Sequence, residues 1–176
     1  PIAEYDIMLK ALSQAKVLDL PIINHCEDPE ISKNGVMNQG VVSSDLGLKG
    51  WPSIAEETMV KRDINLAMKT KARVHLAHIS TRGSIELIRH AKNMGVNITA
   101  EATPHHLTIT EEWVRPNKNS NLKYNTNAKV NPPLRTREDV DAIVSALSDG
   151  TIDCIGTDHA PHSIDDKINS FEEASF

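Results

Sequence analysis

A carboxylate and two imidazoles lie close together in the segment at residues 156–162. Asp158 comes shortly after residues 151–155, an apolar run that is typical of a buried strand. His159 and His162 follow it within four residues. A carboxylate at the end of a buried strand is costly to place without a charged partner, and a metal ion is a common partner. On this segment alone, an Asp that caps the next turn, beside two surface histidines, fits the residues equally well.

Two other strand-like runs end in a histidine. His25 follows residues 20–24, and His78 follows residues 74–77. Zinc accepts neutral imidazole and carboxylate ligands, and a catalytic zinc site keeps one position open for water. His25, His78 and Asp158 could therefore supply three metal ligands. A metal so held makes hydroxide available at neutral pH, and Asp158 could carry the proton.

The alternation of side chains along a strand predicts which histidine of the second run faces the site. Successive side chains of a strand point to opposite faces. His78 therefore shares a face with Leu76 and Val74, whereas His75 points the other way. We expect His78 to face the axis of the fold. His75 should then pack toward the helices as a hydrogen-bonded structural histidine.

Helices and strands are expected to alternate along the chain. Helical patterns begin near residues 4, 53, 81 and 136, and strand-like runs occupy residues 20–24, 74–77, 97–102 and 151–155. Ser53 and Glu56 have the spacing of a capping box. Alternation of this kind implies a parallel sheet with right-handed crossovers. No glycine-rich phosphate fingerprint follows a strand, which argues against a nucleotide-binding doubly wound fold.

The fold class expected from this order is α/β, as half of an eight-fold barrel. In such a barrel the catalytic groups lie at the carboxyl ends of the strands, where His25, His78 and Asp158 are expected. The chain has 176 residues, and a complete barrel typically needs about 250.

Composition excludes several classes of partner. The net charge is −5, aromatic residues make up 3% of the chain, and no basic cluster is present, so we expect no nucleic-acid partner. No apolar run approaches the roughly 20 residues of a membrane span. Cys26 and Cys154 lie in or next to apolar strands, which favours a reducing, cytoplasmic setting over a disulfide framework.

Five blocks of the sequence resemble dihydroorotases of the amidohydrolase superfamily, of the class I bacterial type. The blocks are His-Cys-Glu-Asp at 25–28, Ala-His-Ile-Ser-Thr-Arg-Gly-Ser at 77–84, Ala-Glu-Ala-Thr-Pro-His-His-Leu at 100–107, Asn-Pro-Pro-Leu-Arg at 131–135 and Thr-Asp-His-Ala-Pro-His at 157–162. The resemblance extends over essentially the whole chain. The Asn-Pro-Pro-Leu-Arg block and the Asp-His-Ala-Pro-His block together are its most specific part.

The resemblance implies a partial TIM (β/α)8 barrel of the metal-dependent hydrolase type. Residues 1–176 would be the C-terminal half of that barrel, containing strands five to eight. The His-x-His-x-Arg sequence of the family's first strand, its bridging Asp or modified Lys, and the end of the barrel have no counterpart in the chain. We therefore expect the isolated 176 residues to bind zinc weakly, to have negligible activity, and either to self-associate or to be the retained part of a larger chain.

The resemblance also implies roles for individual residues. His25 and His78 match the histidines that bind the more buried of one or two Zn²⁺ ions. Asp158 matches the catalytic Asp, which also binds the other ion. Asn131 and His162 match residues that hold the substrate.

The implied reaction is the reversible, zinc-dependent cyclisation of N-carbamoyl-L-aspartate to L-dihydroorotate in pyrimidine (UMP) biosynthesis. One alternative keeps the chemistry but changes the substrate, as in dihydropyrimidinases, hydantoinases and allantoinases. Another is a catalytically silent homologue or fragment that acts as an assembly subunit. The implied partners are the small-molecule substrate, a second copy of the chain and aspartate transcarbamoylase.

Four residues near these blocks receive simpler interpretations. We expect His105 and His106 to support the ligands or to pack a loop rather than to bind metal. Arg135 could attract an acidic substrate, but we expect it to be a solvated loop charge. Glu27 should orient His25 or cap the turn that follows.

Overall fold

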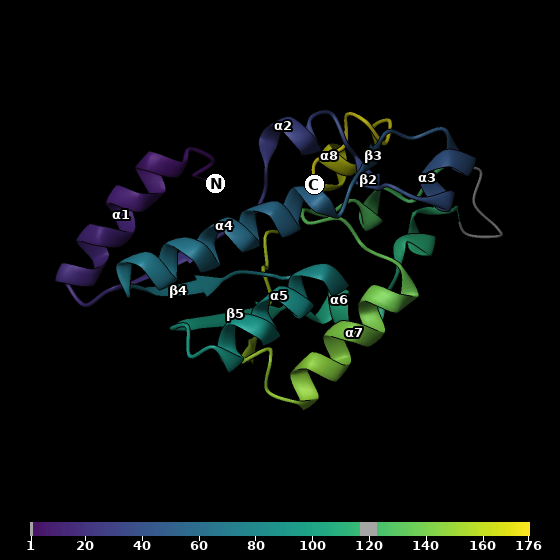
Figure 1. The fold of residues 1–176 in the computed structure, drawn as a ribbon. Coiled ribbons are helices and arrows are strands. Elements are labelled where there is room, and N and C mark those ends of the chain that lie inside the picture. The colour runs from purple at the N-terminus through teal and green to yellow at the C-terminus, as the bar shows by residue number, and fades with distance from the viewer. Residues whose placement is uncertain (1, 117–122) are drawn as a thin grey trace.

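The computed structural model describes residues 2–116 and 123–176, and its centre is a parallel sheet (Figure 1). The strands lie in the order β1 (Pro21–Asn24), β4 (Arg73–Leu76), β5 (Ile98–Ala102) and β6 (Cys154–Ile155). The order in the sheet is thus the order along the chain, and all three pairings are parallel. The expected α/β class with a parallel sheet is confirmed. The carboxyl ends of the strands consequently lie along one edge, which is where the candidate ligands are placed.

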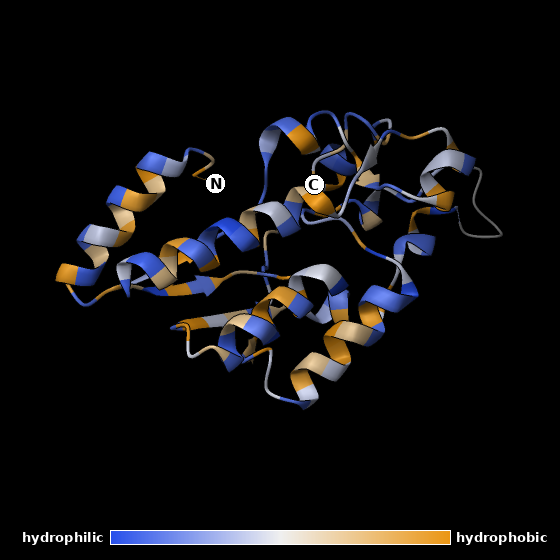
Figure 2. Ribbon diagram, in the orientation of Figure 1, coloured by the Kyte–Doolittle hydropathy of each residue, from blue (hydrophilic) through white to orange (hydrophobic). Residues whose placement is uncertain are grey.

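Four long helices accompany the strands. They are α1 (Tyr5–Val17), α4 (Ile54–Thr70), α5 (Arg82–Asn93) and α7 (Arg137–Ser148). They pack side by side in that order, α1 against α4, α4 against α5 and α5 against α7 (Figure 1). Along α4, α5 and α7 hydrophobic and hydrophilic residues alternate, as expected of helices with one buried face (Figure 2).

Side chains cap two of the expected helix starts, whereas the capping box expected at a third does not form among the described residues. The Thr81 hydroxyl accepts the backbone N–H of Ser84 at the start of α5, and Thr136 forms a capping box at the start of α7. Ser53 makes no side-chain cap, so the predicted capping box at 53–56 is wrong. Glu56 is instead buried and turns toward the loop that follows β4. The tertiary contacts of that loop override the local capping pattern.

The helix-covered face of the sheet contains the main core. Val74 and Leu76 of β4 are buried there, together with Leu66, Ile88 and Ile143 from the helices. Apolar side chains take this face because burial against the helices removes them from water.

The opposite face of the sheet is open in this chain. Ile23 has 70% of its surface exposed, and His75 lies on the same face, directly opposite Thr99 of β5. The prediction that His75 packs toward the helices is therefore wrong. Its neighbours Val74 and Leu76 occupy the helix side, and alternation leaves His75 on the open side.

Shorter elements fill the connections that follow β1, β5 and β6. They are α2 (Pro29–Ser32), β2 (Met37–Asn38), α3 (Val41–Leu46), β3 (Gly50–Trp51), α6 (Pro104–Thr108), η1 (Glu111–Val114), η2 (Thr126–Ala128) and α8 (Ile164–Lys167). Strands β2 and β3 form a small parallel pair. A second core, which includes Val42, Leu134 and the fully buried Phe171, lies beneath these elements. Among the described residues, none of the helices combines the length and the apolar content needed to cross a membrane.

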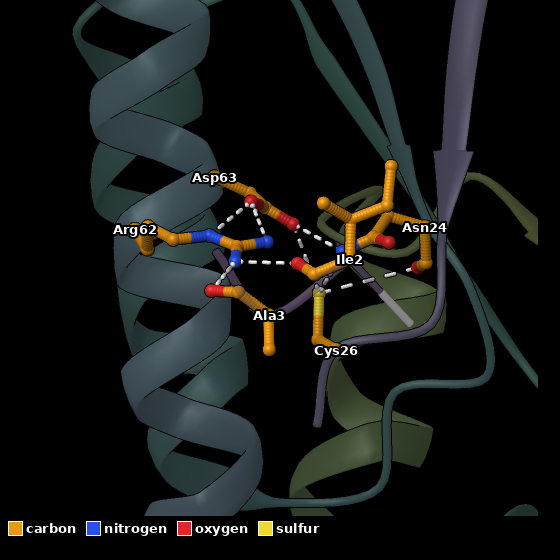
Figure 3. Close-up of polar contacts among 6 residues, drawn as sticks. All are labelled: Ile2, Ala3, Asn24, Cys26, Arg62 and Asp63. Atoms are coloured by element: carbon orange, nitrogen blue, oxygen red, sulfur yellow. Dashed lines mark hydrogen bonds and ion pairs between the residues drawn. The ribbon is translucent and has the colours of Figure 1, made fainter. Parts of the chain in front are cut away.

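A buried polar cluster fixes β1 to α4 (Figure 3). The Asp63 carboxylate, which is fully buried, accepts hydrogen bonds from Asn24 Nδ2 at 2.6 Å and Cys26 Sγ at 3.5 Å. Arg62 pairs with the same carboxylate at 2.7 Å and donates to two backbone carbonyls near the amino terminus. Because Asn24 and Cys26 flank His25 in sequence, this cluster sets the position of the backbone that carries His25.

Candidate metal centre

Two histidines from neighbouring strand ends meet at the carboxyl edge of the sheet. His25 follows β1 and His78 follows β4, and His25 Nδ1 lies 2.8 Å from His78 Nε2. The ring centroids are 4.6 Å apart, with an interplanar angle of 66°. The structure therefore brings together two of the three predicted ligands.

The backbone turns sharply at both His78 and Asp158. Their φ angles are +35° and +48°, in the left-handed region that side chains with a Cβ rarely adopt. Such residues cost on the order of 1–3 kcal/mol each and persist where the surroundings hold them. At His78 the loop is held by the Ala77 N–H, which donates to Asn24 O, and by the Ile79 N–H, which donates to Glu101 O.

The positive φ of His78 explains how it reaches His25. Strand β4 ends at Leu76, and the turn at His78 breaks the two-residue alternation on which the sequence argument depended. His78 therefore joins the site by a turn of the backbone and not by its place in the strand.

Glu27 holds the His25 ring from the side opposite His78. Its Oε2 lies 2.7 Å from His25 Nε2 and accepts a hydrogen bond of 3.3 Å from Asn131 Nδ2, while its Oε1 accepts one of 2.6 Å from Ser32 Oγ. Burial raises the pKa of Glu27, but the hydrogen bonds from His25, Ser32 and Asn131 outweigh it and lower the pKa to about 2. An ionised Glu27 favours a hydrogen on His25 Nε2 and leaves Nδ1 free as a ligand.

The surroundings of His78 favour the neutral form of its imidazole. Burial and the neighbouring His25 lower the pKa of His78, and the charge of Asp158 opposes this. Among the described residues, no hydrogen-bond partner reaches the buried His78 Nδ1. Two facing imidazoles, one oriented by a carboxylate, are a donor set that fits a zinc ion.

Asp158 lies outside the histidine pair. Its side chain is exposed, and its charge partly opposes the lowering of the pKa that burial imposes on both His78 and His105. Within the described parts of the chain, Asp158 completes no group of three ligand atoms within 4.8 Å of one another. The structure therefore places Asp158 beside the two histidines without closing a three-ligand site.

The two predicted substrate residues occupy different places. Asn131 is half-buried beside Glu27, and its Oδ1 has no partner among the described residues. His162 is exposed and lines a cavity of about 260 Å³ together with Asn127 and Lys167. No hydrogen bond in the described residues joins His162 to Asn131.

Sequence reasoning missed the buried polar network that supports this edge. Glu56 accepts hydrogen bonds from the backbone N–H groups of Ser80 and Thr81, directly after His78. Arg135 is 1% exposed and donates to Ser80 Oγ at 3.0 Å and to Asn38 Oδ1 at 2.8 Å. The expectation of a solvated Arg135 is therefore wrong. Its only sequence signal is that it follows the apolar Pro-Pro-Leu run.

His106 packs the loop that carries Asn131. It is 1% exposed, its Nδ1 lies 2.7 Å from Thr103 Oγ1, and its Nε2 lies 3.1 Å from the Pro132 carbonyl oxygen. A ring nitrogen can only donate to a carbonyl, so the Nε2–H form is present and Nδ1 accepts from Thr103. Burial, followed by His105 and Arg135, lowers the pKa of His106 well below 6.5.

Comparison with known proteins shows which proteins this chain is similar to. Residues 2–84 match the family described as dihydro-orotase-like. A protein named dihydroorotase from Caldanaerobacter subterraneus subsp. tengcongensis is 54% identical over the whole chain, and one from Endomicrobium trichonymphae is 52% identical. The chain is related to the dihydroorotases. The resemblance found in the sequence is thereby confirmed, and the chain spans 39% and 40% of the lengths of these two relatives.

Solved structures support the fold. A dihydropyrimidinase from Brevibacillus agri NCHU1002 superposes on 95% of this chain and 37% of its own with a TM-score of 0.79, at 21% identity. A D-hydantoinase from Bacillus sp. AR9 covers 98% of this chain and 38% of its own with a TM-score of 0.80, at 20% identity. The sheet and its helices therefore have the arrangement found in part of these barrel proteins.

Proposed function

We propose that this chain supplies the metal-binding and catalytic edge of a dihydroorotase, which interconverts N-carbamoyl-L-aspartate and L-dihydroorotate with Zn²⁺. The observation that carries the proposal is the His25–His78 pair, with Glu27 behind it, at adjacent strand ends. Relatives named dihydroorotase, which are 54% and 52% identical to this chain over its whole length, support the choice of substrate. We further propose that the four strands are strands five to eight of the barrel, in the C-terminal half.

Each residue has a part in the proposed reaction. His25 and His78 would hold the ion, and Glu27 keeps His25 in the form that binds it. When bound, zinc polarises the amide carbonyl and makes hydroxide available at neutral pH. In the hydrolytic direction, Asp158 accepts the proton of the nucleophile and delivers it to the leaving ring nitrogen.

Substrate binding is assigned to Asn131 and His162. Asn131 Oδ1, which has no partner in the described part of the chain, is an acceptor beside the histidine pair, suited to a ring N–H of the substrate. His162 lies on the exposed segment that follows Asp158 and would contact the substrate from outside the edge.

A chimera tests the proposal. Residues 1–176 replace the matching segment of the Caldanaerobacter relative, so that the rest of a complete chain is present. We expect turnover of dihydroorotate with zinc, and loss of turnover and of the zinc held by the His25–His78 pair in His25→Ala. His90→Ala is the matched control, because His90 is exposed on α5.

Substrate comparison separates the alternatives. Turnover of hydantoin or dihydrouracil in preference to dihydroorotate would replace the proposed substrate by that of another cyclic amidohydrolase. A chimera that binds zinc and turns over none of these substrates would favour a silent assembly subunit. The 176 residues alone are expected to show negligible turnover.

A further inference from the structure

Three side chains with metal-binding atoms meet on the open face of the sheet. They are His75 of β4, Glu101 of β5 and Cys154 of β6, from three adjacent strands. Each offers one ligand atom, and these atoms all lie within 4.8 Å of one another. His75 Nε2 is 3.3 Å from Glu101 Oε2, and Glu101 stands directly opposite Cys154 in the β5–β6 register.

We propose that His75, Glu101 and Cys154 form a second binding site for a divalent metal ion of the zinc class. The site uses none of the side chains assigned to the reaction, and it does not depend on the proposed function. It lies on the open face of the sheet, among the strands, whereas the His25–His78 pair lies in the turns beyond the strand ends.

Thr99 orients His75 for this role. Thr99 Oγ1 lies 2.8 Å from His75 Nδ1, on the far side of the ring from Glu101. When Nδ1 donates its hydrogen to Thr99 Oγ1, Nε2 presents a lone pair toward the Glu101 carboxylate. A lone pair and a carboxylate repel one another unless a proton or a cation lies between them. Fixing the tautomer of a ligand histidine through its second nitrogen is the usual supporting arrangement at metal sites.

Gly156 leaves room for the Glu101 carboxylate. A Cβ atom built at Gly156 would lie 2.5 Å from Glu101 Oε2, so a side chain at this position would displace the carboxylate from where it now lies. The neighbouring Asp153 makes other hydrogen bonds. Its Oδ2 accepts from Lys92 Nζ of α5 at 2.7 Å and from the Ala100 N–H at 2.8 Å. Glu101 is therefore the carboxylate available to the cluster.

The three atoms form a ligand set typical of zinc. Imidazole nitrogen, carboxylate oxygen and thiolate sulfur are all zinc ligands, and three of them leave a fourth position for water. Ligand atoms at about 2.0–2.3 Å from zinc lie roughly 3.5 Å from one another. Small side-chain rotations would bring the three atoms to that spacing, and Cys154, which is exposed and in no disulfide, has space for one.

A cation bound here would change the ionisation of Cys154. Burial, then the charges of Glu101 and Asp153, raise the pKa of the Cys154 thiol. A divalent ion bound between Cys154 and Glu101 would reverse this effect and release the thiol proton.

Alkylation of Cys154 tests the site in the unmodified chain. The 176-residue chain is treated with iodoacetamide with and without Zn²⁺, and each cysteine is followed by mass spectrometry. We expect Zn²⁺ to slow alkylation of Cys154 at least tenfold, and His75→Ala to abolish this protection. Protection that is absent, or that survives in His75→Ala, would overturn the proposal.

Cobalt provides a second readout and separates the two sites. In a His25→Ala/His78→Ala variant, Co²⁺ should give a thiolate-to-cobalt charge-transfer band that Cys154→Ser removes. Cys26→Ser is the matched control and should keep the band, because Cys26 is buried beneath α4 beside Asp63. A band that persists in Cys154→Ser would assign the sulfur ligand to another residue. A band that never forms in a variant with wild-type circular dichroism would refute the site.

Discussion

The Nδ1 atom of His25 lies 2.8 Å from the Nε2 atom of His78, although the two residues are 53 positions apart in the chain. Two parallel strands joined by α4 place both residues at one edge of the sheet. Glu27 orients the first ring, and the left-handed turn at His78 directs the second toward it. The predictions below test this pair and the interactions that position it.

Removal of His25 should weaken zinc binding at the carboxyl edge. His25→Ala leaves one imidazole of the pair, and we expect the zinc affinity of this site to fall at least tenfold, measured by calorimetry in a Cys154→Ser background that silences the second site. His90→Ala should leave the affinity unchanged. An equal affinity in His25→Ala would show that zinc binds elsewhere.

Replacement of Glu27 should weaken zinc binding without removing a ligand. Glu27→Gln loses the charge that favours a hydrogen on His25 Nε2, and the loss of such a supporting carboxylate typically costs about 10–100-fold in metal affinity. The matched control is Glu30→Gln, because Glu30 is exposed on α2. If both variants bind zinc equally well, Glu27 serves only to pack Ser32 and Asn131.

Loss of Asp63 should destabilise the fold. Asp63→Ala removes the buried partner of Arg62, Asn24 and Cys26 (Figure 3), and breaking a buried ion pair from one side costs about 3–5 kcal/mol. Urea unfolding measures the change. Asp141→Ala, at an exposed position on α7, should change the free energy of unfolding by less than about 0.5 kcal/mol. Similar values for the two variants would contradict the role given to Asp63.

His106 should make stability depend on pH. Its pKa is lowered in the folded state, so below the unfolded value of about 6.5 the unfolded chain binds the additional proton. The free energy of unfolding should therefore fall as pH drops below about 6.5, by at most about 1.4 kcal/mol per pH unit from this group. His106→Gln should reduce that slope, and His90→Gln at an exposed position should retain it. An unchanged slope in His106→Gln would assign the effect to His78 or His105.

The sequence by itself determined the order of the elements and the residues at the strand ends. Apolar runs of strand length and helical periodicity are local properties, so they predicted the four parallel strands and placed His25 and His78 after two of them. The strand-end blocks also carried the resemblance that the comparison with known proteins confirmed.

The tertiary structure decided which way these side chains point and which charges are buried. His75 faces the open side because Val74 and Leu76 are buried against the helices. His78 turns back at a positive φ. The sequence predicted a helix cap for Glu56 and a solvated loop charge for Arg135. In the folded chain both residues contact the buried loop that follows His78. Periodicity in the sequence reflects only neighbours within one or two turns of the chain. The orientation of His75 and the burial of Glu56 and Arg135 depend instead on groups distant in sequence that compete for the same buried space.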